Sequence, residues 1–228
     1  MTGVQTCALP ISGGAARRGD GPGPLRRRPL AAAIAPDRAE GLRVYPIGPG
    51  VRRDLPLPGY LPVEAHFRHG RAELLVLAHA SDGARRLLRL PLEGGAPMVV
   101  LDREVTAFAA SPDGRTAATA DASGLLALVE LDGRAERPLG RLAAGEQPIG
   151  WTPDGRGLLL TDAGLLPLKI TRLDVATGAR AVHLVLAPPD PAGVALVDRI
   201  RVDDGGALVA YSFIRITMSD LLLADPPR

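Results

Sequence analysis

The chain has 228 residues and a formal net charge of +2; 46% of its residues are hydrophobic and only 3% are aromatic. This small charge excludes a strongly basic nucleic-acid-binding protein, and no apolar run approaches the roughly 18 residues of a membrane-spanning helix. The single cysteine, Cys7, excludes an intrachain disulfide and a multi-thiolate metal site. We therefore expect a soluble chain that neither binds nucleic acid nor inserts into a membrane.

Residues 1–28 share no pattern with the rest of the chain. The stretch GVQTCALPIS resembles the translation of a sequencing-adapter read-through, and residues 1–12 are therefore not expected to belong to the native fold. They have neither the basic start nor the apolar core of about 7 to 15 residues that a signal peptide needs. Residues 13–28 are rich in glycine, proline and arginine without interleaved aromatics, which predicts a disordered lead rather than a nucleic-acid arm. The boundary predicted here is 1–28 non-native or disordered, and 29–228 folded.

A repeat of about 40 residues runs through the folded part. Its turn glycines are Gly70, Gly114, Gly155 and Gly205, at spacings of 44, 41 and 50 residues. Each is followed by a small or apolar strand and then by a further strand that ends in its own turn, as in LKITRLDVATG. A period of this length built only of strands is typical of β-propeller blades.

The expected fold class is all-β, a β-propeller fragment of about four to five four-stranded antiparallel blades. Pro29 to Pro58 would form strands b, c and d of a first blade that lacks strand a. The complete blades and the final three-stranded blade are expected at Leu61 to Leu101, Glu104 to Gly140, Gln147 to Ala187, and Val194 to Asp225. The fourth strand of each blade is the most polar, as outer edges tend to be.

Five partial blades fall short of the commoner six- or seven-bladed rings. We therefore expect an incomplete ring that forms the C-terminal part of a longer protein, in which upstream residues supply the missing strand. Such a fragment would expose a sheet edge along DLLLAD at 220–225 and would be marginally stable or prone to aggregate. The alternative is a small closed ring of five blades.

Two features carry a family resemblance. The hairpins SPDGR at 111–115 and TPDGR at 152–156 resemble the WD40-like, TolB-type repeat. The tail resembles the C-terminal blade of the propellers attached to bacterial eukaryotic-type serine/threonine protein kinases. Its matching positions are Asp190-Pro191-Ala192-Gly193, Asp204-Gly205, Tyr211-Ser212-Phe213 and Ser219-Asp220-Leu221-Leu222-Leu223.

The resemblance spans about Pro29 to Asp225 and departs from the family at Leu222, where an aromatic residue is usual. The chain has no glycine-rich phosphate loop, no H-R-D loop and no D-F-G. The resemblance therefore implies a propeller whose kinase activity, if any, would belong to another part of the polypeptide.

Histidines offer the first candidate chemistry. His66, His69 and His79 flank one predicted hairpin and could converge on a metal ion, but no carboxylate or cysteine completes a set of three or four ligands. We interpret them as ordinary strand and turn residues. Trp151 stands four residues before its turn glycine, where the other hairpins have Ala110 and His66, and we interpret it as packing between blades rather than lining a channel.

The remaining candidates also have structural interpretations. Asp113, Asp154 and Asp204 precede turn glycines, where a carboxylate can bind nearby backbone amides, and isolated carboxylates cannot supply the six to eight oxygens of a calcium site. Ser212 and Ser219 lack the G-x-S-x-G elbow of a serine hydrolase. No catalytic, cofactor-binding or metal-binding residue is assigned, and no cofactor is expected.

Two functions stay open. The first is a non-catalytic propeller that binds a protein or peptide, as the sensory part of a bacterial serine/threonine kinase-like protein on the cytoplasmic or periplasmic side. The second is the substrate-gating propeller of a peptidase or other enzyme whose catalytic part lies outside this chain. The sequence upstream of Ser12 would separate them.

Overall fold

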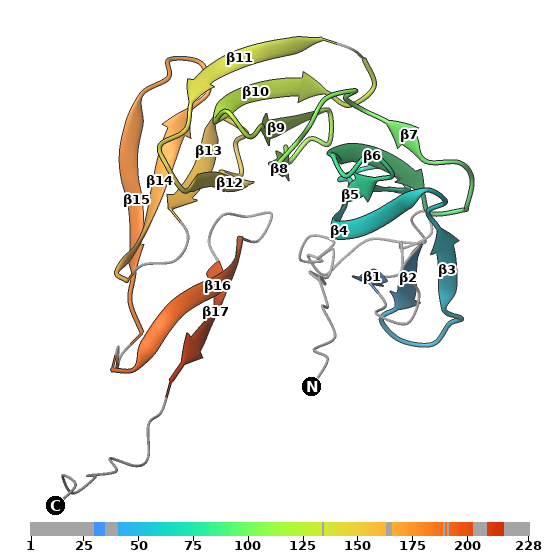
Figure 1. The fold of residues 1–228 in the computed structure, drawn as a ribbon, viewed down its shortest axis with the longest axis horizontal. Helices are drawn as coiled ribbons and strands as arrows, with labels where there is room; N and C mark the ends of the chain where they lie inside the picture. Colours follow the sequence, from blue (N-terminus) through green and yellow to red (C-terminus); the bar gives the residue numbers. More distant parts are fainter. Residues whose placement is uncertain are drawn as a thin grey trace, which may run out of the picture. The chain divides into compact units, whose positions relative to one another are not determined.

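The computed structural model describes residues 30–34, 41–133, 135–162, 166–188, 190, 192–202 and 209–216. These residues form strands joined by turns and loops, and they contain no helix (Figure 1). The chain divides into two compact units, Met1–Leu142 and Ala143–Arg228. Each unit is described by itself.

The first unit contains three antiparallel sheets whose strands follow one another in chain order. The first sheet is β1 (Leu30–Ile34), β2 (Gly41–Pro46) and β3 (Arg53–Pro56). The second is β4 (Tyr60–Phe67), β5 (Glu73–Ala80), β6 (Arg85–Pro91) and β7 (Met98–Val99). The third is β8 (Ala107–Ala110), β9 (Thr116–Ala120), β10 (Leu125–Glu130) and β11 (Glu136–Arg141).

The second unit contains two antiparallel sheets. One has four strands, β12 (Glu146–Trp151), β13 (Gly157–Asp162), β14 (Leu168–Asp174) and β15 (Arg180–Leu186). The other pairs β16 (Val194–Val202) with β17 (Val209–Arg215).

This strand content confirms the predicted all-β fold, a β-propeller fragment with an incomplete set of four-stranded blades. The three complete blades and the three-stranded first blade lie where the repeat placed them. The predicted third strand of the last blade, the turn at Gly205 and the whole segment 1–28 lie outside the described residues.

Strand β5 shows why these sheets stack. Its sequence ELLVLAHA is apolar on both faces, and five consecutive residues, Leu74 to Ala78, are buried. Side chains alternate across a strand, so Leu74 and Val76 pack into a core with the first sheet, whereas Leu75 and Leu77 pack into a core with the third. A blade interior with neighbours on both faces therefore reads as a continuous apolar run.

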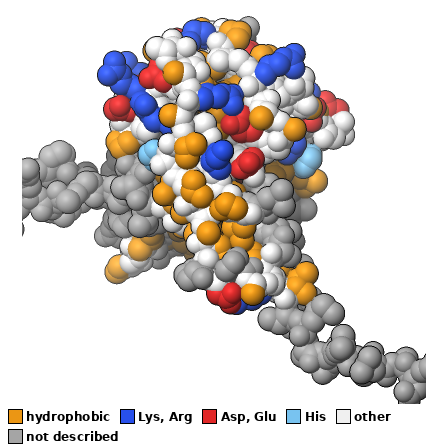
Figure 2. All heavy atoms as spheres, turned by 90° about the vertical axis from the view of Figure 1, so that its left-hand side faces the viewer, with side chains coloured by type: hydrophobic (Ala, Val, Ile, Leu, Met, Phe, Trp, Pro, Cys, Tyr) orange, Lys and Arg blue, Asp and Glu red, His pale blue; other side chains and the backbone are white. Residues whose placement is uncertain are grey.

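The outer strands differ from the inner ones, but the polarity that the sequence predicted for them is found only in part, because β11 is polar whereas β7 (Met98–Val99) and β15 (RAVHLVL) are mostly apolar. β7 has only two residues, and all but one residue of β11 are exposed. β15 is also largely exposed, including Val182 and Val185. Figure 2 faces the side of the structure on which β15 lies and shows hydrophobic side chains gathered on that surface.

Three hairpins join the first and second strands of successive blades, and they share one backbone pattern. In each, the amide of residue i donates to the carbonyl of residue i+5, where residue i is Arg68, Ser111 or Thr152. At the second and third hairpins, the aspartate at i+2 accepts the hydroxyl hydrogen of residue i, at 2.6 Å, and the amide of residue i+4, at 2.9 and 3.0 Å. Asp113 and Asp154 are therefore turn formers, as predicted.

The shared hydrogen-bond pattern shows that the predicted alignment of the hairpins by their turn glycines is wrong for the first hairpin. Gly114 and Gly155 lie at i+3, but Gly70 lies at i+2, so the first hairpin is offset by one residue. The residue equivalent to Ala110 and Trp151 is consequently Phe67, and the match to His66 is wrong. Strand pairing agrees, because Phe67 faces Leu74 as Trp151 faces Leu158.

Gly114 and Gly155 provide a matched pair for a stability test. Both have φ of +66°, but a Cβ on Gly114 would lie 2.2 Å from the His69 carbonyl oxygen, whereas one on Gly155 would meet nothing within 4 Å. We expect Gly155→Ala to lower the free energy of unfolding by about 1 to 2 kcal/mol, the cost of a left-handed alanine. Gly114→Ala should cost clearly more because two hairpin backbones must also separate. Thermal and urea melts of the two variants test this, and equal losses would contradict the close approach.

Candidate functional site

The most elaborate polar cluster in the described residues surrounds Arg68, in the turn between β4 and β5. Its side chain is only 1% exposed, although arginine is rarely buried. At the equivalent hairpin position, Ser111 and Thr152 use a hydroxyl to close their own turns. Arg68 instead carries a long cation that extends to the neighbouring blade.

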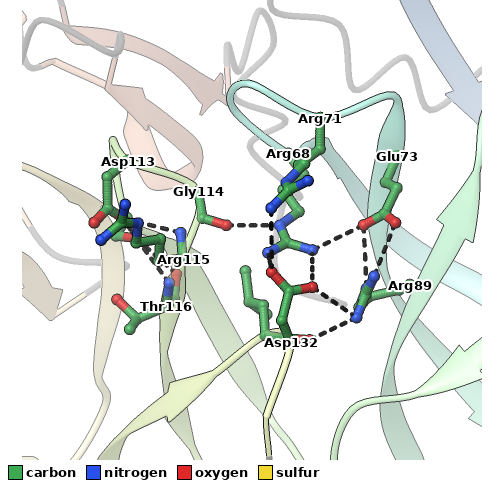
Figure 3. Close-up of polar contacts among 11 residues, drawn as sticks. Arg68, Arg71, Glu73, Arg89, Asp113, Gly114, Arg115, Thr116 and Asp132 are labelled. Carbon is green, nitrogen blue, oxygen red and sulfur yellow. Dashed lines mark hydrogen bonds and ion pairs between the residues drawn. The ribbon is translucent and has the colours of Figure 1, made fainter.

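The Arg68 guanidinium binds groups from both blades (Figure 3). Its Nε donates to the Gly114 carbonyl at 2.6 Å, and Nη1 donates to Asp132 Oδ1 and Glu73 Oε2, each at 2.9 Å. A second bond, from Nη2 to Asp132 Oδ2, makes the Asp132 contact bidentate. Gly114 belongs to the β8–β9 turn and Asp132 to the β10–β11 turn, so one side chain connects three hairpins.

Arg89 on β6 completes the cluster. Its Nε and Nη2 donate to the two oxygens of Glu73, at 3.1 and 2.8 Å, and Nη1 donates to the Leu131 carbonyl at 2.9 Å. The same Nη1 lies 3.0 Å from Asp132. Arg71, more than half exposed, lies 3.8 Å from Asp132 at the edge of the cluster. We call Arg68, Glu73, Arg89 and Asp132 the arginine cluster.

Electrostatics favour the charged forms of Glu73, Asp132 and Arg68. Hydrogen bonds from Arg89 hold the pKa of Glu73 below its ordinary value; burial opposes this shift, and Arg68 adds to it. The Arg68 hydrogen bond likewise lowers the pKa of Asp132 against a smaller effect of burial. Asp132 in turn raises the pKa of Arg68. Neither carboxylate is therefore poised to exchange a proton near neutral pH.

The chemical capacity of this arrangement is to hold loops, not to transfer protons. Around it the hairpins expose His69 and Arg71 on one blade and Asp113 and Arg115 on the next. These four residues form a polar surface on two hairpins fixed to each other, which we call the hairpin platform. A rigid scaffold that presents loop side chains is suited to binding.

The three candidate histidines do not come together. His66 on β4 pairs with Leu75 on β5, and His79 lies four residues further along β5, opposite Leu61. The two histidines are therefore separated by about 13 Å along the hairpin. His66 Nε2 is 2.9 Å from Glu64 Oε1, and the centroid of its ring lies 5.1 Å from that of Phe108 in an edge-to-face arrangement. His79 Nδ1 is 3.2 Å from the Gly83 carbonyl. Among the described residues, no group of three histidine, cysteine, aspartate or glutamate side chains could hold a metal ion.

The other candidate residues from the sequence are Trp151, Ser212, Asp204, Ser219 and the tail motif. Trp151 is buried in β12, and Ser212 is exposed on β17. Asp204 and Ser219 lie outside the described residues. In the tail motif, Asp190 accepts the Ala192 amide at 3.0 Å, and the Gly193 carbonyl accepts the Ile216 amide at 2.8 Å. This part of the motif therefore forms a turn before β16 and extends the β16–β17 pairing by one hydrogen bond.

Sequence reasoning missed the arginine cluster altogether. Its partners are separated by 46 and 64 residues along the chain, so no local pattern connects them. One signal was available, because Arg68 replaces the serine or threonine that occupies the same hairpin position in the next two blades.

Comparisons with known proteins support the fold. TolB from Acinetobacter baumannii resembles the chain with a TM-score of 0.60 and 14% identity, over 80% of this chain and 46% of that one. A chain of the nidogen/laminin complex resembles it with a TM-score of 0.59 and 16% identity, over 77% of this chain and 67% of that one. The tricorn protease matches with a TM-score of 0.50 and 12% identity, over 67% of this chain and 15% of that one.

The fold is that of a β-propeller. The chain spans about half the length of the TolB chain that it resembles. No protein-family model matches the sequence, and no curated protein matches it closely enough to indicate a relative. Within the described residues, no helix is long and apolar enough to cross a membrane.

A substitution at Arg68 tests the structural role of the cluster. Arg68→Met should lower the free energy of unfolding by about 3 kcal/mol, because it leaves Glu73 and Asp132 without their buried partner. Arg71→Met removes the same charge from an exposed position and should cost less than about 1 kcal/mol. Urea melts compare the two variants, and similar losses would show that the cluster does not bind the blades together.

The pH dependence of stability tests the same carboxylates. Their pKa values are lowered by folding, so their contribution is present above the ordinary values of 4.5 for Glu73 and 3.8 for Asp132, and is lost as pH falls through the lower folded values. The wild-type chain should therefore lose stability below about pH 4.5. In Arg68→Met this loss should be shallower, which melts at several pH values between 7 and 3 can measure. A steeper loss in the variant would contradict the assignment.

Proposed function

We propose that this chain is a non-catalytic β-propeller module that binds a protein or peptide through the hairpin platform. The observation that carries the proposal is the arginine cluster, which fixes neighbouring hairpins to one another while their tips remain exposed. Preorganised loops reduce the entropy that binding must overcome. Arginine is also enriched at protein interfaces, and the platform exposes two, Arg71 and Arg115.

The pKa directions of the cluster favour binding over catalysis. Both carboxylates are kept ionised by guanidinium groups, whereas a general acid or base needs a pKa close to the working pH. Asp113 behaves similarly: burial would raise its pKa, but hydrogen bonds from the Ser111 hydroxyl and the Arg115 amide outweigh that effect and lower it.

We further propose that the module belongs to a serine/threonine kinase-like polypeptide of a bacterium. Support comes from the tail resemblance, of which Asp190, Ala192 and Gly193 directly precede β16 and Tyr211 to Phe213 lie in β17. Sequencing the locus upstream of Ser12 from source DNA tests both this proposal and the adapter origin of residues 1–12. A kinase domain should precede the propeller, and residues 1–12 should be absent.

A substrate-gating propeller is the second candidate. The observation in its favour is the fold similarity to the tricorn protease, in which the matching part is 15% of that chain. In that case the upstream sequence should contain a hydrolase in place of a kinase domain.

Peptide selection tests the binding proposal directly. Peptides selected from a random library on the immobilised chain should lose about tenfold or more in affinity for the double variant Arg71→Ala and Arg115→Ala, because loop arginines act as anchors. They should also be released uncleaved. Fluorescence anisotropy and mass spectrometry provide the measurements.

The matched control removes two arginines from the opposite end of the third sheet. Arg103 and Arg141 lie beside the β9–β10 turn, where they contact Asp121 and the Ser123 carbonyl. The double variant Arg103→Ala and Arg141→Ala has the same net charge as the test variant and should retain full affinity. Equal losses in both variants, or cleavage of the bound peptides, would overturn the proposal.

A further inference from the structure

The outer strand β15 differs from the other outer strands in the described residues. Free strand edges are normally blunted by short length, proline or charge. β3 has four residues and ends at Pro56, β7 has two residues, and β11 contains Pro138 and three charged residues. β15 has seven residues, RAVHLVL, with neither proline nor an acidic residue. It is the outer strand among these four that is best able to accept another strand.

A bulge in β15 gathers two exposed valines on one face. Val182 pairs with Thr171 and Leu184 with Ile170, so His183 is the extra residue. The side-chain alternation therefore resets, and Val182 and Val185 lie on the same face although they are three residues apart. They are 57% and 52% exposed.

Leu184 and Leu186 lie on the other face of β15, where they pack against the core that includes residues of β16. The strand is therefore anchored by one face only. Its other face and its outer edge remain available in the second unit.

The exposed face carries a positive charge. Lys169 on β14 pairs directly with Val185, and it is the only lysine in the chain. Within the described part of the chain, its ammonium group has no ion-pair partner, whereas Arg180 on the same strand edge is 2.8 Å from Glu146. An added strand on β15 would lie two strand spacings, about 9.6 Å, from β14. A lysine side chain and a glutamate side chain directed toward each other over Val185 span this distance together. Charge complementarity therefore favours an acidic residue on an added strand.

We propose that the free edge of β15 binds an extended segment of a partner protein as an additional strand, with apolar side chains over Val182 and Val185 and an acidic side chain near Lys169. Main-chain hydrogen bonds would give affinity, and the alternate side chains would give specificity. This surface belongs to the second unit and does not depend on the hairpin platform. A second copy of the chain fits less well, because it would add another Lys169 and no exposed acidic residue from β15.

The probe is a fluorescein-labelled peptide, TVTETVT, which places valine, glutamate and valine on one face of a strand. Two control peptides are TVTKTVT, with the charge reversed, and TPTETPT, whose prolines cannot donate to a strand ladder. Anisotropy with the full chain should show binding of TVTETVT and at least about fivefold weaker binding of each control. Hydrogen exchange should show protection of residues 180–186 by TVTETVT alone.

Variants of the chain separate apolar contact from charge. Val182→Ser with Val185→Ser should weaken TVTETVT by about fivefold, and Lys169→Glu should reverse the preference between TVTETVT and TVTKTVT. Val51→Ser is the matched control, because Val51 is 84% exposed and lies in the first unit. Thermal melts should show that all variants remain folded, as expected for exposed positions.

Three results would overturn the proposal. They are binding of TPTETPT as tight as that of TVTETVT, binding without protection of residues 180–186, and protection of those residues by concentration-dependent dimerisation in the absence of peptide. The last would assign the edge to a second copy of the chain. The double variant Arg71→Ala and Arg115→Ala, which tests the hairpin platform, should leave all of these measurements unchanged. Failure of one proposal can therefore be distinguished from failure of the other.

Discussion

The buried guanidinium of Arg68 is the interaction on which the first unit depends. A charge removed from water is costly unless its donors are satisfied, and here four hydrogen bonds satisfy it. Three of those bonds go to the next blade and one to its own. The requirement to pair one cation therefore determines how two hairpins and a third turn are placed.

The apolar core around this cluster follows from the same stacking of blades. Because few aromatic residues are available, leucines from β5 and β6 fill the space between the second and third sheets, and the small Ala117 of β9 packs against them. Leu75 and Leu77 pack with Ala117 and Phe108 in one such core. Large residues opposite small ones let two sheets approach closely without leaving voids between them. Hydrophobic burial thus supplies the stabilising free energy, and the arginine cluster supplies the specific register of the hairpins.

Local chemistry explains which features could be predicted from the sequence. Turns such as Ser111 to Arg115 contain their own hydrogen-bond partners, so the residues that form them are adjacent and recognisable. The outer strands β3 and β11 are recognisable by their polarity, and β14 by its alternation. The offset at Gly70 escapes prediction because the turn glycine is one residue closer to the start of its hairpin than Gly114 and Gly155 are, and only the backbone bond from Arg68 to Glu73 reveals the equivalent position. The cluster itself escaped because its charges come from separate blades.

These constraints make the arginine cluster suited to holding loops in place rather than to proton transfer. Catalysis by a carboxylate needs a proton affinity matched to the medium, and burial without a counter-ion is the usual means of raising it. The chain does the opposite at Glu73 and Asp132, where guanidinium groups lower the proton affinity and fix the geometry. A site arranged in this way gains rigidity at the expense of reactivity. The exposed hairpin tips then inherit that rigidity, since Arg71 follows Arg68 by three residues and Arg115 follows Gly114 directly.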